Sequence, residues 1–205
     1  LASVYLGLLR NGDELLYCSG TPYDTMKTVI GLDEDNLSPG NLLEYGIRYR
    51  QVELKENGEV DIDAVKKAIG PKTTMAALQR STGYSFRKAL TTDQISEWVK
   101  ACKSVKPDII CMVDNCYGEF TDYADPIELG ADIMAGSLIK NPGGGLALSG
   151  GYIAGRKDLV DRIYFRVTCP GIGGECGLTF GQTRTMMQGL FIAPRVTNGA
   201  VKGAR

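Results

Sequence analysis

The chain has 205 residues, 43% of them hydrophobic and 23% charged, and a formal net charge of −1. This composition supports one substantial core and excludes a disordered chain, and the small net charge gives no basic surplus for a nucleic acid or an anionic membrane. No apolar run approaches the roughly 20 residues that span a bilayer, and no signal peptide opens the chain. We therefore expect a cytoplasmic protein.

Turn residues and apolar periodicity predict alternating helices and strands along the chain. The first half is expected to hold a helix over 1–9, a strand over 14–17, a helix over 23–30, a loop over 33–46, a strand over 47–54, a helix over 61–69 and a strand over 74–78. The second half is expected to hold a helix over 92–104, a strand over 109–113, a short turn or helix over 127–130, strands over 132–135 and 150–154, and a helix over 156–165. Repeated β-α-β units predict a doubly wound α/β domain with a mostly parallel sheet. No linker or repeat divides it.

Cysteine and histidine usage limits the chemistry. The six cysteines form no Cys-x-x-Cys pair, which favours reduced and mostly buried thiols. The chain has no histidine, which excludes a Ser-His-Asp or Cys-His mechanism within it and removes the commonest zinc ligand. We expect no metal site.

Asp114 follows directly on the strand 109–113, which is apolar on both faces, as a buried strand of a parallel sheet is. Ligands gather at the carboxyl ends of such strands. Asp114 is therefore placed to meet a ligand. The alternative is an acid that caps a neighbouring helix or turn.

Lys140 lies between the predicted strand 132–135 and three consecutive glycines, which let the backbone approach a bulky ring. An acid and a lysine so placed suit a pyridoxal-phosphate (PLP) enzyme. The amine forms a Schiff base with the cofactor aldehyde, and the carboxylate keeps the pyridine nitrogen protonated. Desolvation or a cationic neighbour would lower the pKa of Lys140. A solvated surface lysine is the alternative.

Three blocks of sequence carry a family resemblance: 79–84 (Gln-Arg-Ser-Thr-Gly-Tyr), 114–120 (Asp-Asn-Cys-Tyr-Gly-Glu-Phe) and 136–145. They resemble the methionine gamma-lyase-like branch, often labelled aluminium resistance protein, of the fold-type I PLP enzymes of Cys/Met metabolism. The resemblance implies the large domain of the PLP-dependent transferase-like fold over 1–205, incomplete at both ends. An upstream phosphate-binding segment and a downstream small domain would lie outside this chain. It also implies a homodimer or homotetramer.

The resemblance implies roles for further residues. Asp114 and Asn115 would contact the cofactor, and Ser137 would bind its phosphate, although a serine that satisfies a local turn is the alternative. Tyr23 would stack on the cofactor ring and help to protonate a leaving group. The family usually shows Tyr-Gly-Gly-Thr at this point, whereas this chain reads Tyr23-Asp24-Thr25.

Candidate substrate contacts are Gln79, Arg80 and Tyr84. Arg80 could pair with a carboxylate through its planar fork, or it could form an ordinary salt bridge. A glycine-rich segment that carries Arg166, Thr168 and Glu175 is expected to be a loop that could cover the site.

The sequence therefore predicts a PLP-dependent carbon–sulfur lyase that acts on a small sulfur-containing amino acid, with Lys140 and Tyr23 as the catalytic residues. Two alternatives stay open. One is another PLP reaction, such as γ-replacement, transamination or aldol cleavage. The other is a PLP-binding regulatory or structural protein with little turnover.

Overall fold

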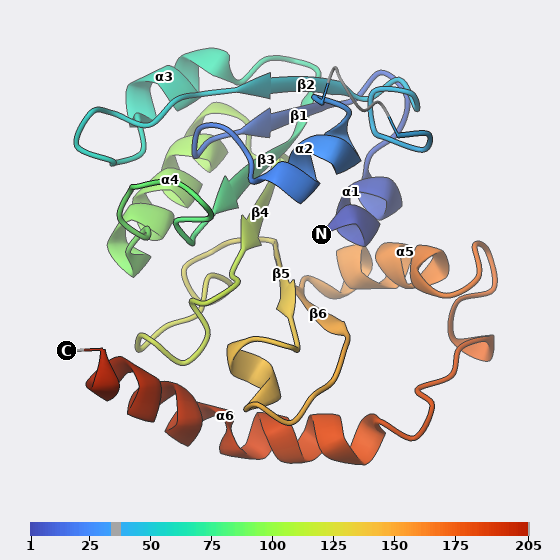
Figure 1. Ribbon diagram of the computed structural model, residues 1–205. Helices are drawn as coiled ribbons and strands as arrows, with labels where there is room; N and C mark the ends of the chain where they lie inside the picture. Colours follow the sequence, from blue (N-terminus) through green and yellow to red (C-terminus); the bar gives the residue numbers. More distant parts are fainter. Residues whose placement is uncertain (34–37, 205) are drawn as a thin grey trace.

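One mixed sheet organises the computed structural model, which describes residues 1–33 and 38–204 (Figure 1). Its strands within those residues are β1 (Glu14–Tyr17), β2 (Arg48–Gln51), β3 (Thr73–Gln79), β4 (Ile110–Asp114), β5 (Ile133–Ser137) and β6 (Gly151–Gly155). They lie in the order β2-β1-β3-β4-β5-β6. The first five are parallel, and β6 runs antiparallel to β5. The carboxyl ends of β1 to β5 therefore meet at one edge.

Helices cover both faces of this sheet. The helices of the described residues are α1 (Ala2–Leu8), α2 (Asp24–Ile30), α3 (Ile62–Ala68), α4 (Thr92–Val105), α5 (Lys157–Val167) and α6 (Thr183–Gly203), with short 3-10 turns η1 (Asn141–Gly143) and η2 (Gly173–Glu175). Helices α1, α2 and α5 pack on one face, and α3 and α4 pack on the other. Adjacent strand residues supply the two cores, since Leu15 faces the first and Leu16 the second.

Local sequence signals explain where several helices begin and end. Thr91 and Gln94 form a reciprocal capping box at the start of α4, and the Asp61 carboxylate accepts the Ala64 N–H at the start of α3. Helix α2 ends at Gly31, whose φ of 101° is readily adopted only by glycine. These caps satisfy backbone groups that would otherwise face no partner.

The expected α/β domain with a mostly parallel sheet is confirmed in the described residues, where the sheet has six strands and one of them is antiparallel. Strand β2 is shorter than the predicted 47–54 because it is a largely exposed edge strand, beyond which Leu54 bridges Val60. Positions 34–37 of the predicted loop 33–46 lie outside the described residues. Helix α6 was not predicted, and it carries Pro194 in its interior.

Helix α6 packs on the turn that follows Lys140. Gly189 faces η1, since a Cβ on it would lie 2.2 Å from the Gly143 carbonyl oxygen. Such a close approach requires a glycine. The helix therefore supports the segment that carries Lys140. Among the described residues, no helix has both the length and the apolar character needed to cross a membrane.

Candidate functional site

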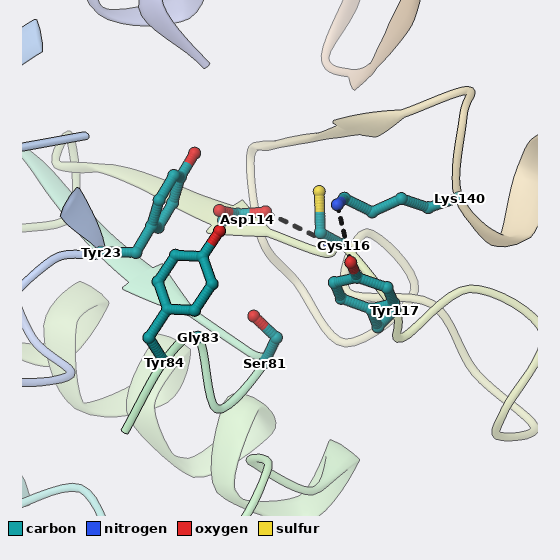
Figure 2. A pocket seen from close by; sticks show the side chains of 8 residues that line it. All are labelled: Tyr23, Ser81, Gly83, Tyr84, Asp114, Cys116, Tyr117 and Lys140. Atoms are coloured by element: carbon teal, nitrogen blue, oxygen red, sulfur yellow. Dashed lines mark hydrogen bonds between the residues drawn. The ribbon is translucent and has the colours of Figure 1, made fainter. Parts of the chain in front are cut away.

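A cavity of about 150 Å³ opens at the carboxyl ends of the central strands. Figure 2 shows its lining residues, which are Tyr23, Ser81, Gly83, Tyr84, Asp114, Cys116, Tyr117 and Lys140. Cavities of this size can hold a single aromatic ring. The structure thus brings four predicted site residues, Tyr23, Tyr84, Asp114 and Lys140, together around one ring-sized space.

Asp114 ends β4 and lies at the back of this cavity. The residue is 2% exposed, and the Cys116 backbone N–H donates to its Oδ1 at 3.1 Å. Burial raises the pKa of Asp114, and the hydrogen bonds from Cys116 and the charge of Lys140 act in the opposite direction without outweighing burial. A cation or a protonated ring nitrogen in the cavity would therefore stabilise the ionised form of this buried carboxyl group.

Lys140 follows β5 and points toward the cavity from the other side. Its Nζ donates to the Tyr117 hydroxyl at 2.8 Å and lies 4.3 Å from the centroid of that ring. The hydrogen bond to Tyr117 raises the pKa of Lys140, and partial desolvation acts in the opposite direction without outweighing it. The expected lowering of this pKa is therefore wrong for the arrangement seen here, because a hydroxyl acceptor stabilises the ammonium.

Tyr23 and Tyr84 form the opposite wall, and Figure 2 places Asp114 between them and the Lys140–Tyr117 pair. Tyr23 immediately precedes α2, and burial raises the pKa of its hydroxyl. Tyr84 is 85% exposed, so it lies at the rim. Aromatic faces on one side, an acid at the back and an amine on the other side suit a planar ring that bears a protonated nitrogen.

Arg80 and Asn115 contact each other behind the cavity. The Arg80 guanidinium donates to the Asn115 Oδ1 and to the Gly118 carbonyl oxygen, both at 3.0 Å, and lies 3.8 Å from the Asp122 carboxylate. Arg80 is 5% exposed. The sequence left open whether Arg80 forms a salt bridge within the protein, and the structure shows one with Asp122. Roles of Arg80 in substrate binding and of Asn115 in cofactor binding stay predictions.

Gln79 and Ser137 lie beside the cavity rather than among its lining residues. The Gln79 Oε1 accepts from the Tyr17 hydroxyl at 3.4 Å, and its Nε2 donates to the Ser81 carbonyl oxygen at 3.2 Å. Ser137 ends β5, and its carbonyl oxygen accepts the Lys140 N–H at 3.3 Å. Their proposed roles in substrate and phosphate binding also stay predictions.

Sequence reasoning assigned no role to Cys116 or Tyr117, although both lie in the block 114–120. Burial and the nearby Asp114 carboxylate raise the pKa of Cys116 to about 12, so its thiol is neutral at physiological pH. Tyr117 has a φ of 68°, which aims its ring at Lys140. The spacing of apolar residues cannot predict a tyrosine in the left-handed conformation. The neighbouring Gly118, a residue common in turns, was the available sign of a turn here.

The expected loop with Arg166, Thr168 and Glu175 is only partly a loop. Arg166 lies in the last turn of α5, because that helix continues to Val167. The Thr168 hydroxyl donates to the Gly173 carbonyl oxygen at 2.7 Å, and Glu175 ends η2. None of the three is among the residues that line the cavity.

The donor set fits PLP better than a metal ion. In residues 1–33 and 38–204, no three His, Cys, Asp or Glu side chains converge as metal ligands would. By contrast, a buried acid and a lysine amine face the same ring-sized cavity. Asp114, Lys140 and Tyr23 are the residues that could hold the cofactor ring.

Comparisons with known proteins agree with the resemblance. The family model described as methionine gamma-lyase matches residues 1–205. The uncharacterized protein YnbB of Bacillus subtilis is 45% identical over 198 residues, which are 97% of this chain and 47% of YnbB. An L-methionine gamma-lyase of Pseudomonas deceptionensis is 28% identical over 80% of this chain and 36% of its own length.

A solved structure matches equally well. It is that of a candidate cystathionine beta-lyase involved in aluminum resistance from Listeria monocytogenes, with a TM-score of 0.95 and 49% identity, over 99% of this chain and 50% of that protein. The chain therefore spans about half the length of these two relatives, YnbB and the Listeria protein.

Proposed function

Because the chain belongs to the methionine gamma-lyase family, we propose that it forms the cofactor-binding part of a PLP-dependent carbon–sulfur lyase. The observation that carries this proposal is the convergence of Asp114 and Lys140 on one cavity. The names of the Pseudomonas and Listeria relatives, one a methionine gamma-lyase and one a candidate cystathionine beta-lyase, both describe cleavage of a carbon–sulfur bond. The substrate we propose is a small sulfur-containing amino acid.

Asp114 would hold a proton on the cofactor's ring nitrogen. Its burial disfavours an isolated carboxylate, so a protonated nitrogen in contact with it would be strongly favoured. When bound, PLP supplies an electron-poor ring that withdraws negative charge from the α-carbon of an amino acid. The Asp114 charge keeps that capacity high by keeping the nitrogen protonated.

Lys140 would attach the cofactor and, once released, move a proton at the substrate α-carbon. General acid–base catalysis of this kind needs the amine within hydrogen-bond reach of the carbon, and Lys140 points to the cavity from the side opposite Tyr23. Burial raises the pKa of the Tyr23 hydroxyl, which keeps it protonated but makes it a weaker acid, so donation to a leaving sulfur would require a positive charge near it in the cavity. Tyr23 also offers its ring for stacking.

The finer architecture belongs to the same proposal. The sheet and its helices would be the large domain of the fold-type I PLP enzymes, and the protein would be a cytoplasmic homodimer or homotetramer. The family match and the structural match to the Listeria protein support the first part. The oligomeric state would be measured by light scattering on the purified protein.

The cofactor assignment can be tested by fixing the linkage. The purified protein is incubated with PLP, reduced with borohydride and digested, and the peptides are mapped by mass spectrometry. We expect the pyridoxyl group on Lys140. A Lys140→Arg variant should lose the label, whereas Lys157→Arg, on an exposed site of α5, should keep it. Label on another lysine, or equal label in Lys140→Arg, would overturn the assignment.

Activity is tested separately with methionine and cystathionine as probes. A carbon–sulfur lyase releases a thiol product and a keto acid in equal amounts from such substrates, and both products can be quantified. A keto acid without a thiol would instead indicate transamination. Cofactor binding with no product from either probe would favour a regulatory role.

A further inference from the structure

Tyr117 has a backbone conformation that side chains rarely adopt. Its φ of 68° lies in the left-handed region that favours glycine. Two hydrogen bonds hold the turn in this shape. The Gly118 N–H donates to the Asn115 carbonyl oxygen at 2.8 Å, and the Asn141 side chain donates to the Tyr117 carbonyl oxygen at 3.3 Å. The residue after Lys140 thus helps to fix the position of Tyr117.

The Tyr117 side chain contacts one amine in two ways. Its hydroxyl lies 2.8 Å from the Lys140 Nζ, and its ring centroid lies 4.3 Å from the same atom (Figure 2). A hydrogen-bond acceptor and an aromatic ring within about 6 Å both stabilise an ammonium group. Tyr117 is 58% exposed, so burial in a core does not account for its orientation.

Backbone strain persists where the surrounding structure enforces it, and such positions cluster at functional sites. We propose that Tyr117 is a positioning residue for Lys140, which keeps Nζ at the cavity next to Asp114 whenever the amine is free. The inference rests on the proposed function, since that function requires a free Lys140 amine during turnover.

Asn141 links the turn that carries Tyr117 to the turn that carries Lys140. Its side-chain Nδ2 also donates to the Glu119 carbonyl oxygen at 3.0 Å, so one amide ties the turn after β4 to the turn after β5. Hydrogen bonds between these two turns therefore hold the backbone of Tyr117 close to the backbone of Lys140.

The titratable groups that face Lys140 are those of Tyr117, Cys116, Tyr84 and Asp114. The Tyr117 hydrogen bond is the largest cause that raises the pKa of Lys140. Removing this hydroxyl while keeping the ring therefore lowers that pKa. The cation–ring contact remains in a phenylalanine, so the change isolates the hydrogen bond.

The test is competitive acetylation of the purified, cofactor-free protein across a pH series, with the extent of labelling at Lys140 quantified by mass spectrometry. Acetylation consumes the neutral amine, so its midpoint reports the pKa of Lys140. In Tyr117→Phe we expect the midpoint to move to lower pH and labelling at pH 8 to accelerate several-fold. Thermal unfolding checks that the variant is folded.

The matched control is Tyr123→Phe, which removes the hydroxyl of a fully exposed tyrosine in the same loop. Its labelling midpoint should equal that of the parent protein. An unchanged midpoint in Tyr117→Phe, or an equal shift in both variants, would overturn the positioning role. Because labelling needs no cofactor, failure of the proposed function appears separately, as absence of a pyridoxyl group on Lys140 after borohydride reduction.

Discussion

Replacing Asp114 with asparagine should have opposite effects on stability and on turnover. The substitution keeps the size and shape of the side chain and removes its charge. Because asparagine retains an Oδ1, the Cys116 N–H keeps its acceptor, so the turn after β4 should survive. What changes is the cost of burying a carboxylate that is 2% exposed.

The effect on stability follows from the direction of the pKa shift. Burial raises the pKa of Asp114 above its ordinary value of 3.8, so the folded protein binds this proton more tightly than the unfolded chain does. Stability therefore falls as the pH rises through the window above 3.8. Each unit of such a shift costs about 1.4 kcal/mol at neutral pH. Cofactor-free Asp114→Asn should thus melt at a higher temperature than the parent at pH 7, and the difference should vanish below pH 3.8.

The effect on turnover has the opposite sign. Asparagine cannot keep a pyridine nitrogen protonated as a carboxylate does. Loss of one such preorganised interaction costs about 2–4 kcal/mol at the transition state, which slows the step by about 30- to 900-fold. The assay is exchange of the α-proton of methionine with solvent deuterium, followed by NMR in the PLP-loaded protein.

The matched control is Asp63→Asn, which makes the same chemical change on the exposed side of α3. It should leave the exchange rate unchanged, and it should not raise the melting temperature, because an acid in the first turn of a helix is stabilising. Parent-like exchange in Asp114→Asn would show that Asp114 is not the partner of the ring nitrogen. A lower melting temperature of the cofactor-free variant at pH 7 would refute the reasoning from burial.

Two further substitutions test how the surroundings of the site are built. Gly136→Ala would place a Cβ 2.5 Å from the Glu119 Oε1 and from a Tyr152 ring carbon. Overpacking of this kind costs about 1–3 kcal/mol, so the melting temperature should fall by roughly 2–12 °C. An unchanged melting curve would contradict this prediction. The bidentate bond from Arg50 lowers the pKa of Glu14, so this stabilisation is present above pH 4.5 and is lost as the pH falls through the lowered pKa. With Arg50 half exposed, Glu14→Gln should cost about 1 kcal/mol at pH 7 and flatten the acid side of a stability–pH curve, and equal acid sensitivity of both proteins would count against this pairing.

The central strands and their ends were predictable because burial on both faces leaves a continuous apolar run. Ile110 to Val113 reads in this way, and the polar residue that follows it marks the end of the strand. In a parallel sheet, this end meets the end of the next strand, so the sequence could place Asp114 and Lys140 at one edge. No knowledge of side-chain contacts was needed for this step.

Helix α6 and the direction of β6 were harder to predict for physical reasons. Helix α6 contains Gly189, Pro194 and Gly199, which local propensity opposes, and it forms because its small residues allow close packing on η1. For β6, alternation of side chains is the same in parallel and antiparallel strands. The connection from β5 to β6, residues 138–150, holds the short turn η1 and no crossover helix, and β6 returns antiparallel to β5.

Two residues of the site have unfavourable local energetics, and sequence reasoning missed one of them, Tyr117. The left-handed turn at Tyr117 and the buried carboxyl group of Asp114 both oppose the stability of the protein alone. Composition and periodicity report favourable choices, so they do not reveal the turn at Tyr117, whereas Asp114 could be found from its place at the end of a strand. A bound cation would offset the free-energy cost of burying the Asp114 carboxylate. The strained turn holds the Tyr117 side chain against the Lys140 ammonium group. Their placement around one cavity is therefore better explained by a ligand than by folding, and the Asp114→Asn variant separates the two contributions by their opposite signs.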